Sequence, residues 1–138
     1  MATLFTTIEK QILSQGLSIA SFDLERPWGG FFVLEEREAQ RFSDIYFEGY
    51  DVASLRKEGK LSPKILLVKP QARLSWQYHH RRAEIWRVVQ GPVGVIRSFD
   101  DTENQLENCA AGQTITLKKG ERHRLIGLDS WGVVAEFW

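Results

Sequence analysis

Two hydrophobic periods divide the chain into a short first part and a long second part. Near the N-terminus, Leu4, Ile8 and Ile12 lie four residues apart, and Gly16 follows them. Apolar residues at this spacing lie on one face of a helix, and a glycine after the last of them is typical of a helix end. We therefore predict an N-terminal helix that covers one side of the core, in preference to a helix that binds a partner.

From Trp28 onward the pattern changes to short segments rich in β-branched and aromatic residues, separated by turn residues. Many short strands at near-regular spacing are typical of an all-β sandwich or closed barrel. A charged stretch at 51–60 is predicted to be a short helix or a loop. The predicted strands are residues 30–34, 43–48, 63–69, 73–79, 84–90, 93–98, 113–117 and 132–138.

Length and charge narrow the class of protein. The 138 residues suit one domain, with a helix and lead-in at 1–24 and a β-barrel at 25–138. Eighteen basic residues balance eighteen acidic ones, so no long-range field favours nucleic acid or a membrane surface. The N-terminus resembles neither a signal peptide nor a membrane span. The single cysteine, Cys109, cannot form an internal disulfide, so we expect an inert thiol in a cytoplasmic protein.

Candidate chemistry is concentrated in the segment 74–91. Because side chains alternate along a strand, Gln77 and His79 point to the same side, whereas His80 points away. A turn between His79 and Glu84 would reset the alternation and place Glu84 on a face with Trp86. The two strands would then be antiparallel neighbours that bring Gln77, His79 and Glu84 together.

A second cluster, at 112–123, contributes one more histidine. Gly112 and Gly120 bracket a predicted strand and turn that lead into His123. If this histidine reaches the same end of the barrel, two imidazoles, a carboxylate and an amide oxygen form a metal site. Such a donor set suits Zn, Mn, Fe or Ni, and the mixture does not select one of them. The four candidate ligands are Gln77, His79, Glu84 and His123.

These residues resemble the two motifs of the cupin superfamily. Its first motif reads G, five residues, H-x-H, three or four residues, E, six residues, G. Its second reads G, five residues, P-x-G, two residues, H. The matching positions in the first motif are Gln77, in place of the first histidine, His79, Glu84 and Gly91. Those in the second are Gly112, Lys118, in place of proline, Gly120 and His123.

The Gln-x-His form is similar to the cupin domain of type II mannose-6-phosphate isomerases. That family shows R-P-W-G near the start of the domain and K-P-G-x-x-L-S-x-Q-x-H-x-x-R-x-E-H-W later. The resemblance covers about 25–137, and it implies a single jelly-roll-like β-barrel with zinc held by the four candidate ligands. Gln71 and Ile85 depart from the pattern, at its glycine and at the histidine of E-H-W. The matching positions are 26–29, Lys69, Pro70, Leu74, Ser75, Gln77, His79, Arg82, Glu84 and Trp86.

The resemblance implies a metal-dependent aldose–ketose isomerase that acts on a small sugar phosphate. Such a reaction needs a base that moves a proton between C1 and C2, and Lys64 and His80 are the candidates. Arg82 is the candidate cation for the phosphate and the reaction. Ser75 could donate a hydrogen bond to the substrate, and Trp86 could line the pocket.

Two other functions fit the same residues. One is a cupin that binds a sugar or metabolite without turnover, which the replacement of the E-H-W histidine by Ile85 favours. The other is a different metal-cupin enzyme, such as an oxygenase, which would need a redox-active metal. The edges of the barrel and the apolar N-terminal helix would permit a homodimer.

Overall fold

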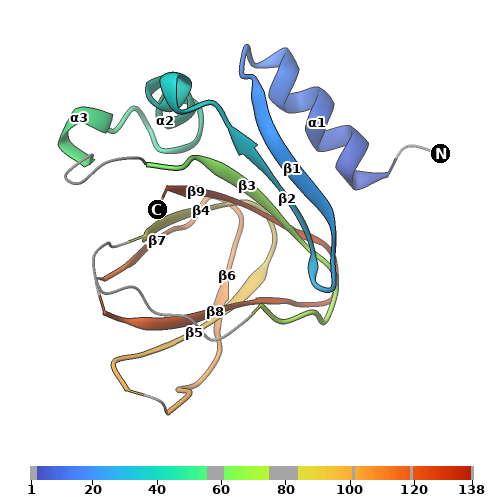
Figure 1. Ribbon diagram of the computed structural model, residues 1–138. Coiled ribbons are helices and arrows are strands. Elements are labelled where there is room, and N and C mark those ends of the chain that lie inside the picture. Colours follow the sequence, from blue (N-terminus) through green and yellow to red (C-terminus); the bar gives the residue numbers. More distant parts are fainter. Residues whose placement is uncertain (1–2, 56–60, 75–83, 101, 119, 138) are drawn as a thin grey trace.

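The computed structural model describes residues 3–55, 61–74, 84–100, 102–118 and 120–137. Two antiparallel sheets face each other, with strand orders β1-β2-β3-β9-β4-β7 and β6-β5-β8 (Figure 1). This arrangement confirms the predicted all-β fold with a short N-terminal helix. The strands are β1 Ile19–Arg26, β2 Gly29–Leu34, β3 Lys64–Val68, β4 Glu84–Gln90, β5 Val93–Ser98, β6 Glu107–Cys109, β7 Thr114–Leu117, β8 Arg122–Gly127 and β9 Gly132–Phe137.

The first helix, α1 (Leu4–Ser14), follows the predicted apolar stripe. The Thr3 side chain caps it by accepting a hydrogen bond from the Thr6 backbone N–H at 3.2 Å. Ile8 and Ile12 are its buried residues, and Gly16 follows with φ +79°, a conformation that glycine adopts without steric cost. None of the helices in the described ranges is long and apolar enough to cross a membrane.

The strand predicted at 43–48 is wrong. A short 3-10 turn, η1 (Glu36–Glu38), leads there into helix α2 (Ala39–Tyr46). Phe42 and Tyr46 lie four residues apart and are buried together, so the helical period determines which side chains reach the core. In the stretch at 51–60, α3 (Val52–Leu55) is a helix, and 56–60 lie outside the described residues.

Six of the other predicted strands correspond to β2, β3, β4, β5, β7 and β9. Three strands were not predicted: β1, β6 and β8. Of the strand predicted at 73–79, the described part reaches Leu74. Arg73 forms an isolated bridge with Ile126, and the Leu74 backbone N–H donates to the Leu125 carbonyl at 3.0 Å. The chain therefore runs beside β8 before it enters the segment 75–83.

The six-stranded sheet separates two hydrophobic cores. Its outer face is covered by α1 and α2, as Figure 1 shows, and the shared core contains Ile12, Phe32, Phe42 and Phe137. Its inner face packs against the three-stranded sheet through a second cluster. That cluster includes Leu66, Trp86, Val88, Val95, Leu117, Leu125 and Val134.

Candidate functional site

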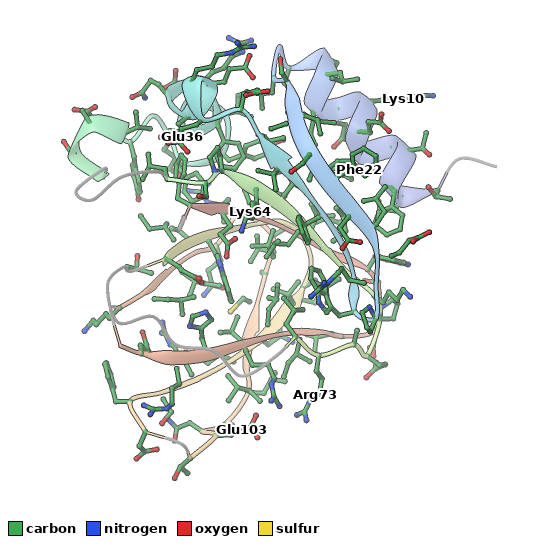
Figure 2. The ribbon with its side chains drawn as sticks, in the orientation of Figure 1. Lys10, Phe22, Glu36, Lys64, Arg73 and Glu103 are labelled. Atoms are coloured by element: carbon green, nitrogen blue, oxygen red, sulfur yellow. The ribbon has the colours of Figure 1, made fainter. Side chains whose placement is uncertain are left out.

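One end of the inner face is polar, and it is built from three neighbouring strands. Glu136 on β9 lies opposite Lys64 on β3 and opposite Trp86 on β4. Because directly paired residues of antiparallel strands share a face, the three side chains form one row across the sheet. Figure 2 labels Lys64 in this row. The row begins where the apolar inner core of Leu66, Val88 and Val134 ends.

Trp86 connects this row to the opposite sheet. Its indole Nε1–H donates a hydrogen bond to Glu136 Oε1 at 3.0 Å, and both residues are buried. The Trp86 ring also meets the His123 ring edge to face, with 5.3 Å between centroids and 86° between planes. The prediction that Glu84 and Trp86 share one face therefore agrees with the structure, which buries both.

Glu84 and His123 meet inside the barrel, although 38 residues separate them in the sequence. His123 Nε2 lies 2.9 Å from Glu84 Oε2, and the two side chains are 3% and 4% exposed. Glu84 begins β4 in the larger sheet, and His123 lies on β8 in the smaller one. The two sheets thus place a carboxylate and an imidazole in direct contact, away from solvent.

The turn before β8 holds His123 by its other ring nitrogen. Glu121, which is buried, accepts a hydrogen bond on Oε1 from the Lys118 backbone N–H at 2.9 Å. The Glu121 carbonyl lies 3.3 Å from His123 Nδ1. With a proton assigned to Nδ1, Nε2 and Glu84 Oε2 are both acceptors, and only a proton or a metal cation between them makes their contact favourable. Metal-binding histidines commonly have this second hydrogen bond.

Burial and charge act on the titratable groups of the site. Burial alone would lower the pKa of His123, but the hydrogen bond to Glu84 and the charge of Glu84 raise it overall. Burial, followed by the nearby Glu84 charge, raises the pKa of Glu136 to about 7. The Trp86 hydrogen bond and the positive charge of Lys64 act in the opposite direction. Two carboxylates therefore share a buried region with one imidazole and one ammonium group.

Glu84 and His123 are the two predicted metal ligands that the structure describes, and it brings them together. The other two, Gln77 and His79, lie outside the described residues, as do Ser75, His80 and Arg82. In the described ranges no three His, Cys, Asp or Glu side chains are grouped as a metal would require. The donor chemistry of the buried pair fits zinc or another borderline divalent metal. The described residues thus supply half of the predicted ligand set.

Ile85 and Cys109 have no part in this polar region. Ile85 packs against the outer core with Phe137, on the face of β4 opposite Glu84. Cys109 is buried in the inner apolar cluster, and burial raises the pKa of its thiol, as expected for an inert cysteine.

Glu136 is the site residue that the sequence analysis missed. A signal for it was present, because it is the one charged residue in the segment 132–137, which otherwise reads GVVAxF. By alternation it shares a face with Val134, and β9 is paired on both sides. A charge on an inward face of a central strand is a departure from the apolar pattern that indicates a functional role.

The facing antiparallel sheets, with the carboxylate and imidazole between them, define a cupin-type β-barrel. KdgF from Halomonas sp. has a similar fold, with a TM-score of 0.58, 14% identity, and coverage of 85% of each chain. The Drosophila melanogaster CENP-C cupin domain gives a TM-score of 0.55 at 14% identity, covering 87% of this chain and 73% of that one. The chain belongs to the mannose-6-phosphate isomerase C-terminal family, whose model matches residues 35–132.

Curated relatives extend this family match. The xanthan biosynthesis protein XanB of Xanthomonas campestris pv. campestris is 34% identical over an alignment of 116 residues, and the match covers 80% of this chain and 20% of XanB. The alginate biosynthesis protein AlgA of Pseudomonas aeruginosa is 41% identical over an alignment of 71 residues, and the match covers 49% of this chain and 15% of AlgA. The matched region thus spans a fifth or less of the length of these relatives.

Proposed function

We propose that the protein is a metal-dependent sugar-phosphate aldose–ketose isomerase, with mannose 6-phosphate as the first substrate to test. The observation that carries the proposal is the buried contact between Glu84 and His123 in a chain of the mannose-6-phosphate isomerase C-terminal family. Zinc is the proposed metal, with Mn, Fe and Ni as the alternatives. Glu84, His123, Gln77 and His79 would hold it.

When bound, the metal would supply positive charge to the substrate oxygens on which negative charge develops. The remaining roles belong to the chain itself. Arg82 is proposed to bind the phosphate and take part in the reaction, and Ser75 to donate a hydrogen bond to the substrate. Trp86 would form a wall of the pocket. Lys64 and His80 are the proton-transfer candidates from the sequence, and Lys64 lies in the polar row beside Glu136.

The position of Ile85 weakens the case for a cupin that binds without turnover. That case relied on the replacement of the histidine of E-H-W by Ile85. Because Ile85 packs against the outer core, this replacement removes no group from the polar end of the inner face. The polar end of the inner face therefore still holds Glu84, His123 and Lys64, the charged groups on which the proposed isomerase chemistry relies.

A turnover assay tests the proposal. Zinc-loaded protein is given fructose 6-phosphate or mannose 6-phosphate, and the other sugar phosphate is measured with and without a chelator. The proposal requires turnover that the chelator abolishes and that returns with the metal. If the sugar phosphate raises the melting temperature of the fully metallated protein but no product forms, the protein is a binding cupin instead.

A further inference from the structure

Glu136 is a buried carboxylate to which the proposed function assigns no role. It is 7% exposed, and burying an ionised carboxylate is costly unless hydrogen bonds or opposite charges compensate. In the described part of the chain its carboxylate accepts one hydrogen bond, from Trp86 Nε1. This neutral donor and the nearby charge of Lys64 do not offset the cost of burial, which raises the pKa of the group overall. The position is therefore better explained by chemistry than by stability.

The neighbours of Glu136 place it within the site rather than beside it. The strand register puts it between Lys64 and Trp86, and Trp86 itself contacts the His123 ring. The charges of Glu84, Lys64 and His123 all act on its carboxyl group. The Trp86 hydrogen bond fixes one carboxylate oxygen, Oε1, and so orients the whole group inside the barrel.

We propose that Glu136 is the base that moves the proton between C1 and C2 of the sugar phosphate. This inference rests on the proposed function. Among the described charged groups, Glu84 contacts His123 and is a proposed metal ligand. Its carboxylate is therefore not available as the base. The ammonium group of Lys64 has three donors and no lone pair to accept a proton. Lys64 instead supplies the positive charge that favours an ionised Glu136.

The proposed isomerisation has two steps, removal of the proton from C2 and delivery of a proton to C1. As the C2–H bond of the open-chain aldose breaks, a Glu136 oxygen forms an O–H bond with that proton. The C2–H electron pair becomes the C1–C2 double bond of an enediolate, and the C1=O π pair moves to O1. Glu136 then returns a proton to C1, the C1–C2 π pair forms the new C1–H bond, and the O2–H proton passes to O1 as C2=O forms. No oxidant or reductant is required.

Glu136→Gln tests this role with little change in shape, because the amide oxygen can still accept from Trp86 Nε1. We expect kcat to fall roughly 10²- to 10⁴-fold, the usual contribution of a general base. Incorporation of solvent deuterium at C1 of the fructose 6-phosphate should fall in parallel. Zinc content and the rise in melting temperature with mannose 6-phosphate should match those of the wild type. The matched control is Glu9→Gln, at an exposed carboxylate on α1, which should keep wild-type kcat.

The outcomes separate this inference from the proposed function. A wild-type protein that turns over no sugar phosphate rejects both. An active wild type together with Glu136→Gln of similar kcat and deuterium incorporation rejects the inference alone. Loss of zinc from Glu136→Gln would make Glu136 a support of the metal centre and would also reject it as the base. Glu136→Asp, which keeps a carboxylate on a shorter stem, should recover part of the lost kcat.

Discussion

The two faces of the six-stranded sheet differ in what their side chains do, although the same strands supply both. On β4, Ile85 and Val89 pack against the helix-covered outer core, whereas Glu84, Trp86 and Val88 point inwards. The outer face is apolar beneath the helices, and towards β7 it carries Arg87, which donates a hydrogen bond to Thr114 Oγ1 and pairs with Glu48. The inner face is apolar over most of its length and becomes polar where β3, β4 and β9 carry Lys64, Glu84 and Glu136.

The last two residues of the described part of β9 show the contrast most closely. Phe137 stacks on Phe47 with 4.9 Å between ring centroids and meets Phe42 edge to face at 5.1 Å. Glu136, one position earlier, accepts the hydrogen bond from Trp86 on the other face. Neighbouring residues thus point to opposite faces of the sheet, so substitutions on the two faces should have separable effects.

The largest stability effect should come from the outer face. Phe42→Ala removes a fully buried ring that packs against three aromatic neighbours, Tyr46, Phe47 and Phe137. We expect the free energy of unfolding to fall by about 3–5 kcal/mol, measured by urea denaturation. Zinc affinity of the folded protein should not change. Phe22→Ala, at a ring that is 64% exposed, is the control and should cost less than about 1 kcal/mol.

A smaller effect on the free energy of unfolding, one that depends on pH, should come from Glu136 on the inner face. The pKa of Glu136 is raised from 4.5 to about 7 in the folded protein, so the native state binds its proton more tightly than the unfolded chain does. The resulting stabilisation is complete below pH 4.5 and is lost as the pH rises through 7. The loss for metal-free protein should be up to about 3 kcal/mol by pH 8.

Glu136→Gln isolates this effect because glutamine does not titrate. Urea denaturation of metal-free wild type and variant at pH 5 and pH 8 should show that the variant loses less stability over this interval. The variant should therefore be the more stable protein at pH 8. An equal pH dependence of the free energy of unfolding in the two proteins would contradict a raised pKa of the buried Glu136 carboxyl group.

The smallest effect should come from restoring the family residue at Ile85. The side chain lies on the outer face, so Ile85→His should change zinc affinity and kcat by less than about twofold, or roughly 0.5 kcal/mol. Isothermal titration with zinc and the turnover assay measure the two quantities. A tenfold or larger gain in either would mean that the outer face contributes to the chemistry and would remove the distinction between the faces.

Alternation and period predicted much of this molecule. The stripe of Ile8 and Ile12 predicted α1, and the motif positions led to Glu84 and His123, which the structure places in contact. At 43–48 a strand pattern and a helical pattern overlap, and the predicted strand was wrong. The run Ile45, Tyr46, Phe47 has a β-rich composition, but Phe42 and Tyr46 share a helical face, and the core buries that face.

Other features depend on partners that are distant in the sequence. The edge strand β1 alternates weakly because neither of its faces is fully buried. Glu136 becomes part of the site only through the register that pairs β9 with both β3 and β4, which its own segment does not encode. The predicted ligands Gln77 and His79 stay predictions, since they lie outside the described residues.

Metal analysis of purified, dialysed protein tests the central claim, a metal centre between the two sheets. Wild type and Ile85→His should each retain about one zinc ion per chain. His123→Ala and Glu84→Gln should retain almost none while their circular dichroism shows a folded barrel, because each loses one of the two donors that meet at 2.9 Å. Wild-type zinc content in His123→Ala would contradict the account.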